Sequence, residues 1–253
     1  MTTNARRIAH RTANWICRRS VQTVGQGVVA LVVLLSGSGA TSAQDAKAQY
    51  PVMAPLEQYR IANPSDEIAL ARSAAPVSIS GDADVLVLGA HGYETAVKGK
   101  NGFACIVQRS WATNFDDPEF WNFKMRGLIC FNPASVRSVL PPYLKRTEWV
   151  LAGVSKPEML ERIKASIAAS TFPAPEAGSM CYMLSKQGYL GDAVGHWRPH
   201  LMFFFPRTAD SAWAANLPGS PVLSSQANPD PVTVFFIPVI KWSDGTPGPT
   251  DLM

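Results

Sequence analysis

The sequence lacks the short motifs by which many enzymes are identified. No G-x-G-x-x-G or G-x-x-x-x-G-K segment occurs in the 253 residues, which excludes the usual glycine-rich phosphate loops. A G-x-S-x-G nucleophile elbow is also missing, and the nearest segment, Gly219-Ser220-Pro221, has no strand–turn–helix context. No internal repeat at a solenoid period is found. A named chemistry therefore does not follow from any motif.

Acidic residues are absent from positions 1–43, which contain five arginines. An apolar run at residues 28–35 follows and passes into small residues that end at Thr41-Ser42-Ala43. A basic N-terminal region, a short apolar run and small residues at a cleavage site are typical of a secretory signal peptide. The run is too short to span a bilayer, which takes about 20 residues. We expect a signal peptide over residues 1–43, a periplasmic or secreted protein, and membrane contact only through that signal; the Arg18-Arg19 pair leaves the export route open.

Residues 44–253, which follow this leader, have no excess of basic charge. It holds five of the 23 Lys and Arg residues and none of the 19 Asp and Glu residues, so 18 basic and 19 acidic residues remain. These charges are scattered, without a basic stripe or an acidic tail. The composition therefore does not support a nucleic-acid partner. We expect an unidentified small molecule or an envelope component instead.

Cysteine is scarce, with three residues after the leader: Cys105, Cys130 and Cys181. In an oxidising compartment this count predicts one disulfide and one remaining thiol. Cys105 and Cys130 both lie in apolar, strand-like segments and are the nearest pair in the sequence, so they are the predicted disulfide. Another pairing, or three buried thiols, are the alternatives, because free cysteine behaves as a small core residue.

The pattern along the chain predicts one globular domain at residues 63–245. Residues 44–62 are small, polar and proline-containing, which favours a flexible lead-in, and residues 246–253 are expected to form a loose tail. Asn63 and the residues after it predict a helix at about 65–73. Ser155, with Glu158 three residues later, is a capping box that opens a further helix. Two shorter helical runs are expected between residues 134 and 152.

Strand-like runs flank these helices. Residues 84–88, 93–97 and 103–108 are predicted to form an antiparallel meander, with Asn101-Gly102 as a hairpin signal. A short strand is expected at 125–131 and others toward the C-terminus, where residues 201–205 are apolar throughout and should be buried on both faces. The predicted fold class is α+β: an antiparallel sheet of about five to six strands with the central helical segment packed on one face.

Potential ligand residues cluster only in the segment 189–200. Asp192, His196 and His200 are four apart, a spacing that would gather them on one side of a helix and allow a metal site. Gly191, Gly195 and Pro199 argue against a helix there. An extended segment would separate Asp192 from His200 by roughly 26 Å. No cofactor is predicted, and a metal held by these three residues is the alternative to a loop whose histidines bond backbone carbonyls.

The same segment supplies the candidate site residues. The candidates for ligand binding are Asp192, His196, Trp197, Arg198 and His200. A second hypothesis pairs the Cys181 thiol with His200 as nucleophile and base, which requires their two strands to be neighbours. The non-catalytic alternative is that Cys181 is a buried structural thiol and that His200 caps a strand.

Two functions follow from these observations. The first is an exported, non-enzymatic module that binds a ligand or an envelope component. The alternative is a small periplasmic hydrolase or metal-assisted enzyme using Asp192, His196 and His200, with Cys181 as a further candidate.

Overall fold

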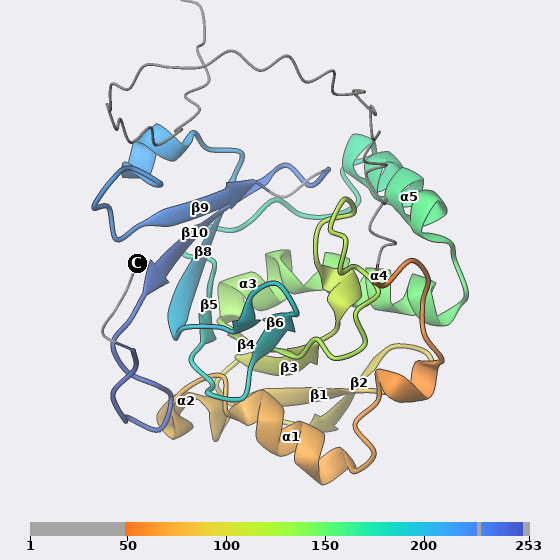
Figure 1. Cartoon of the computed structure of the whole chain (residues 1–253), viewed down its shortest axis with the longest axis horizontal. Coiled ribbons are helices and arrows are strands. Elements are labelled where there is room, and N and C mark those ends of the chain that lie inside the picture. Colours follow the sequence, from red (N-terminus) through yellow and green to blue (C-terminus); the bar gives the residue numbers. More distant parts are fainter. Residues whose placement is uncertain (1–48, 227–228, 250–253) are drawn as a thin grey trace, which may run out of the picture. The chain divides into compact units, whose positions relative to one another are not determined.

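Eight strands form one sheet in the order β2-β1-β3-β4-β5-β8-β10-β9 (Figure 1). The computed structural model describes residues 49–226 and 229–249, which belong to one compact unit. The strands are β1 Asp84–Leu88, β2 Tyr93–Val97, β3 Ala104–Gln108, β4 Gly127–Phe131, β5 Met180–Met183, β8 His200–Pro206, β9 Leu223–Gln226 and β10 Val232–Pro238. A separate two-stranded sheet pairs β6 (Tyr189–Gly191) with β7 (Gly195–His196).

The mixed, mostly antiparallel architecture agrees with the prediction, but the sheet is larger than the five to six strands expected. Strand β9 shows why. Its sequence, Leu-Ser-Ser-Gln, holds a single apolar residue, so hydrophobic alternation gives no sign of it. It is held at the edge of the sheet by its antiparallel pairing with β10.

Two of the described helices begin at capping residues that the sequence analysis identified. The helices are α1 Pro64–Arg72, α2 Val77–Ser80, α3 Pro133–Ser138, α4 Leu140–Leu151 and α5 Lys156–Ala168, and the 3-10 turns are η1 Leu56–Gln58, η2 Ser110–Ala112 and η3 Asp210–Trp213. The Asn63 side chain accepts from the Ser65 amide at 3.0 Å, and Ser155 Oγ accepts from the Glu158 amide at 3.4 Å. Among the described helices, none is both long and apolar enough to cross a membrane.

The predicted three-stranded meander is wrong, because β3 lies on the far side of β1 from β2 and runs parallel to β1. The chain after β2 crosses the start of β1, where the Lys100 amide donates to Asp82 O at 2.7 Å and the Asn101 side chain donates to Ile79 O at 2.8 Å. Gly99 permits this crossing, since a Cβ there would lie 2.2 Å from Asp82 O. The Asn-Gly turn thus closes a crossover and not a hairpin.

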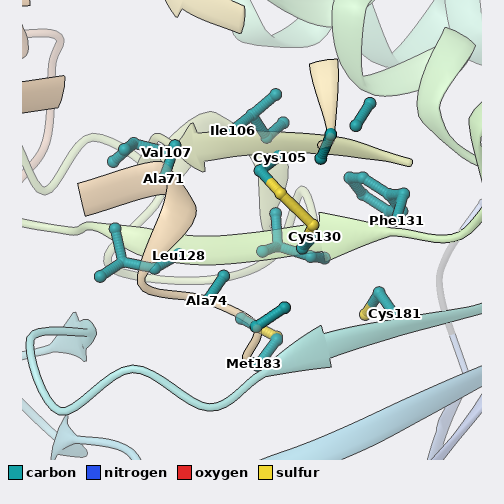
Figure 2. Packing of buried hydrophobic residues seen from close by; sticks show 14 of the residues in the cluster. Ala71, Ala74, Cys105, Ile106, Val107, Leu128, Cys130, Phe131, Cys181 and Met183 are labelled. Atoms are coloured by element: carbon teal, nitrogen blue, oxygen red, sulfur yellow. A yellow bond between two sulfur atoms is a disulfide. The ribbon is translucent and has the colours of Figure 1, made fainter. Parts of the chain in front are cut away.

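Helices lie on both faces of the sheet, and the prediction had placed only the central helical segment, on one face. Every residue of β4 is buried, and alternate residues of a strand point to opposite faces. On one face Phe131 contacts Tyr143 of α4, with ring centroids 6.0 Å apart. On the other, α1 packs against β1, β3 and β4, where Ala71 and Ala74 join the same core cluster as Leu128 (Figure 2).

Strand β8 is less buried than its all-apolar sequence predicts. Only Phe204 is buried, and the other apolar residues of the strand stay partly exposed. On one face Phe203 and Phe205 contact the single turn η3 through Trp213, at 6.0 and 5.1 Å between ring centroids. On the other face the helices cover the strand incompletely, which leaves the cavity described below.

The predicted disulfide between Cys105 and Cys130 is confirmed. The two residues lie directly opposite each other on β3 and β4, with Cα atoms 4.0 Å apart, and both are fully buried (Figure 2). Cys181, on β5, is a buried free thiol. Burial raises the pKa of this thiol well above its ordinary value.

The segments flanking the predicted domain are also ordered where they are described. Tyr59 is fully buried, and its hydroxyl donates to Trp121 O at 2.8 Å, so this part of the expected lead-in packs into the core. Beyond residue 245, the Gly248 amide donates to Ile240 O at 2.7 Å. The predicted signal peptide, residues 1–43, lies outside the described residues.

Candidate functional site

A cavity of about 460 Å³ lies between α4 and the half-covered face of the sheet; we call it the α4 cavity. Helices α3 and α4, the segment that follows α5, and strands β8 and β10 all contribute to its wall. The lining residues are Ser138, Val139, Pro142, Tyr143, Arg146, Ile167, Ser170, Phe172, Pro173, Ala174, Pro175, Phe204, Asp230, Pro231, Val232 and Val234. Most of this lining is apolar.

Proline-rich segments and a sharp helix end shape the wall. Helix α5 stops with Ser170 in the left-handed region at φ 52°, where the Ser170 amide bonds Ile167 O and the Thr171 amide bonds Ser166 O. The chain then continues through Phe172-Pro-Ala-Pro, which cannot extend the helix. Ser138 Oγ accepts from the Glu176 amide at 3.0 Å, so the segment after α5 is bonded to α3 beside the cavity.

Arg146 supplies a buried cation to the cavity wall. Its side chain is 5% exposed, donates from Nη2 to Thr113 O at 2.6 Å, and lies 4.4 Å from the centroid of the Phe115 ring. Its Nε, also buried, has no hydrogen-bond partner among the described residues. Burial lowers the pKa of Arg146, and the negative charge of Asp230 opposes that effect.

Asp230 and Tyr143 complete the polar part of the lining. Neither the Asp230 carboxylate nor the Tyr143 hydroxyl forms a hydrogen bond within the part of the chain that the structure describes. Burial raises the pKa of the Asp230 carboxyl, while Arg146 and Arg207 act in the opposite direction. Burial also raises the pKa of the Tyr143 phenol well above its ordinary value, so it stays a neutral donor. The site therefore offers one cation, one carboxylate and one hydroxyl in an apolar enclosure.

Comparison with known proteins adds no assignment. No protein-family model, no curated protein and no solved structure matches this chain. The functional argument therefore rests on the geometry of the chain itself.

Asp192 lies at the turn between β6 and β7, where it is surrounded by donors. It accepts from the Tyr50 hydroxyl at 2.5 Å, from Lys124 Nζ at 3.1 Å, and from the Tyr189 hydroxyl. These hydrogen bonds lower the pKa of Asp192 to about 2. Glu119 accepts from the backbone amides of Asp192 and Ala193 at 2.7 and 2.9 Å. This network anchors the β6–β7 turn to two other loops.

The two candidate histidines bond backbone carbonyls, as the loop hypothesis expects. His196 Nδ1 lies 2.7 Å from Gly188 O, and His200 Nδ1 lies 2.7 Å from Arg198 O. Residues 49–226 and 229–249 contain no group of three His, Cys, Asp or Glu side chains placed to hold a metal ion. The structure thus does not bring Asp192, His196 and His200 together.

Trp197 and Arg198 also have separate structural contacts and do not share a site. Trp197 is buried in the main core, donates from Nε1 to Ser185 O at 2.9 Å, and packs over Gly188, where a Cβ would lie 2.2 Å from its ring. Arg198 is half-buried, and its backbone carbonyl forms the hydrogen bond with His200 Nδ1. None of the five candidate ligand residues lines the α4 cavity.

Cys181 and His200 do lie on neighbouring strands, β5 and β8. The register is offset, however: Cys181 faces Met202, while His200 faces Met183. No hydrogen bond joins the thiol to the imidazole within the described residues. A buried thiol whose pKa is raised is also a poor nucleophile, since the thiolate is the reactive form.

The imidazole of His200 packs between Trp197 and Phe236, and burial lowers its pKa below the ordinary 6.5. The unfolded state therefore binds a proton near pH 6.5 that the folded state does not, and this contribution to stability is lost as the pH falls. We expect the free energy of unfolding to decline below this pH, by up to about 1.4 kcal/mol per pH unit from this group. Urea denaturation between pH 5 and 8 should show a flatter profile for His200→Gln; identical profiles for both proteins would contradict the assignment.

The residues of the α4 cavity escaped the sequence analysis. One signal was present: Arg146 lies on the same side of its helix as Tyr143 and Val150, in the apolar stripe that packs on the core. A cation in such a stripe must find acceptors or a ligand. Asp230 had no such signal, because it lies in a proline-rich link.

Proposed function

We propose that this chain is an exported, non-enzymatic binding protein whose ligand is a small molecule with an apolar body. The α4 cavity is the binding site. The observation that carries the proposal is a partly enclosed, mainly apolar cavity whose lining includes Arg146 and Asp230. Arg146 Nε is buried and has no partner among the described residues, and no salt bridge within them involves Asp230.

An uncovered apolar wall is costly for a folded chain, because it keeps apolar surface in contact with water. A buried donor left without an acceptor costs roughly 1–3 kcal/mol more. Small-molecule sites typically enclose about 300–1,000 Å³ with mostly apolar walls and a few polar groups. The α4 cavity, at about 460 Å³, fits that description.

Export is supported by two independent features. Residues 1–43 have the composition of a secretory leader. The Cys105–Cys130 disulfide is of the kind that persists in chains working in an oxidising compartment. By contrast, the enzymatic alternative built on Asp192, His196 and His200 has no observation of comparable weight, since each of these side chains serves a separate loop contact.

The cavity assignment is tested by filling it from its exposed rim. Ala174 lines the cavity and is solvent-exposed, so Ala174→Trp should fold normally while its indole occupies the space. We expect the affinity of an apolar fluorescent dye, 8-anilinonaphthalene-1-sulfonate, to fall by about tenfold or more. Fluorescence titration of the purified protein measures this.

Ala177→Trp is the matched control. Ala177 is exposed in the same segment but does not line the cavity, so dye affinity should stay at the wild-type value. Urea denaturation of each variant checks that the fold is intact. Equal dye binding by Ala174→Trp and the wild type, or no saturable binding at all, would refute the proposal.

A further inference from the structure

The two charges of the α4 cavity come from different parts of the fold. Arg146 projects from α4, and Asp230 lies just before β10. They do not form an ion pair with each other within the described residues, although each affects the pKa of the other. Opposite charges in one enclosed space usually pair directly, because the low dielectric strengthens their attraction. Here neither charge forms a salt bridge within the described residues, and Arg207 is a second cation that acts on Asp230.

We propose that the ligand is a zwitterion with an apolar body, of the class of apolar amino acids. Its carboxylate faces the Arg146 guanidinium, and its ammonium group faces the Asp230 carboxylate. The Tyr143 hydroxyl adds a neutral donor in the same wall. This inference rests on the proposed function of the α4 cavity and names the chemistry of its ligand.

Ligands of a single charge fit this lining less well. A simple anion, such as a fatty acid, satisfies Arg146 but places a second negative charge in the same enclosure as Asp230. A simple amine satisfies Asp230 but brings a second positive charge into the cavity that contains Arg146. A neutral apolar molecule offers a counter-charge to neither group, although buried charges are stabilised by one.

The remainder of the lining suits an apolar side chain. Ile167 and Phe172 contribute from the end of α5 and the segment after it, and Phe204 and Val234 contribute from the sheet. Phe204 is itself held by Phe131 in the core, with ring centroids 6.3 Å apart. The apolar wall is therefore backed by the packed part of the sheet, and it offers a preformed surface for an aliphatic or aromatic group.

The test compares amino acids with analogues that lack one charge. L-phenylalanine is titrated against 3-phenylpropanoate, which lacks the ammonium group, and 2-phenylethylamine, which lacks the carboxylate. L-leucine is treated likewise with 4-methylpentanoate and 3-methylbutylamine. Calorimetric titration of the wild-type protein should show at least one of the two amino acids binding about tenfold or more tightly than both of its analogues, as expected for a hydrogen bond to a charged group.

Asp230→Asn identifies the ammonium contact. We expect it to weaken binding of that amino acid by about tenfold and to leave the des-amino analogue unchanged or tighter. Asp82→Asn, at an exposed position outside the cavity lining, is the control and should bind as the wild type does.

The outcomes separate the two proposals. If the dye fails to bind, or binds Ala174→Trp normally, the binding function itself is wrong. If the dye site behaves as expected but neither amino acid binds more tightly than its analogues, only the zwitterion inference is overturned. An equal effect of Asp230→Asn on the amino acid and its des-amino analogue overturns it as well.

Discussion

Replacing Glu67 by glutamine is expected to lower the free energy of unfolding by about 3–5 kcal/mol, because it leaves a buried guanidinium without its counter-charge. The side chains of Arg109 and Glu67 are 0% and 3% exposed, and Arg109 Nη2 lies 2.9 Å from Glu67 Oε1. The same carboxylate oxygen accepts from the Leu88 amide at 3.1 Å. Arg109 also donates from Nε to Tyr59 O at 2.8 Å, so this pair ties α1 to β1 and to the chain before it.

An exposed ion pair provides the matched control. Arg162 and Glu158 lie on α5, 2.7 Å apart, with side chains 42% and 53% exposed. Glu158→Gln should cost about 0.5 kcal/mol or less, because solvent screens the pair. Urea denaturation of both variants, with the disulfide intact, measures the difference. Similar losses in the two variants would show that burial does not strengthen the Glu67 contact.

Removing the disulfide is expected to have the next largest effect. Cys105 and Cys130 are separated by 25 residues, and the chain-entropy model gives about 3 kcal/mol for closing a loop of that size. Both side chains are fully buried, so Cys105→Ala/Cys130→Ala loses packing as well. The free energy of unfolding of the double variant should therefore fall by at least about 3 kcal/mol.

A reducing agent distinguishes the cross-link from the packing. Unfolding the wild type in dithiothreitol should reproduce most of the loss, whereas the double variant should be insensitive to the reductant. Cys181→Ala, which removes the free thiol, should keep the wild-type response to reductant. A wild type whose stability is the same in dithiothreitol would show that the disulfide contributes little.

The cavity escaped prediction for a physical reason. Its lining residues come from α3, α4, the end of α5, β8 and β10, and apart from the consecutive helices α3 and α4 these elements are far apart in the sequence. The segment 189–200 attracted attention because its potential ligands are close in sequence. The structure gives those side chains separate partners instead: Asp192 bonds two tyrosines and a lysine, and each histidine bonds a carbonyl. Closeness in sequence did not produce a shared site.

The sequence by itself determined the features that depend on neighbours along the chain. The starts of α1 and α5 follow from Asn63 and Ser155, whose side chains cap amides two and three residues away. The strands with strong apolar patterns were recognisable for the same reason. The disulfide was also within reach, because only one pair of cysteines lay in adjacent strand-like runs.

Only the tertiary structure decided what depends on contacts between distant segments. The crossover that makes β1 and β3 parallel relies on Gly99 fitting against the backbone at Asp82. The space that has Arg146 and Asp230 in its wall forms where α3, α4, the end of α5, β8 and β10 meet. Such contacts arise from packing many residues at once, and no local pattern encodes them.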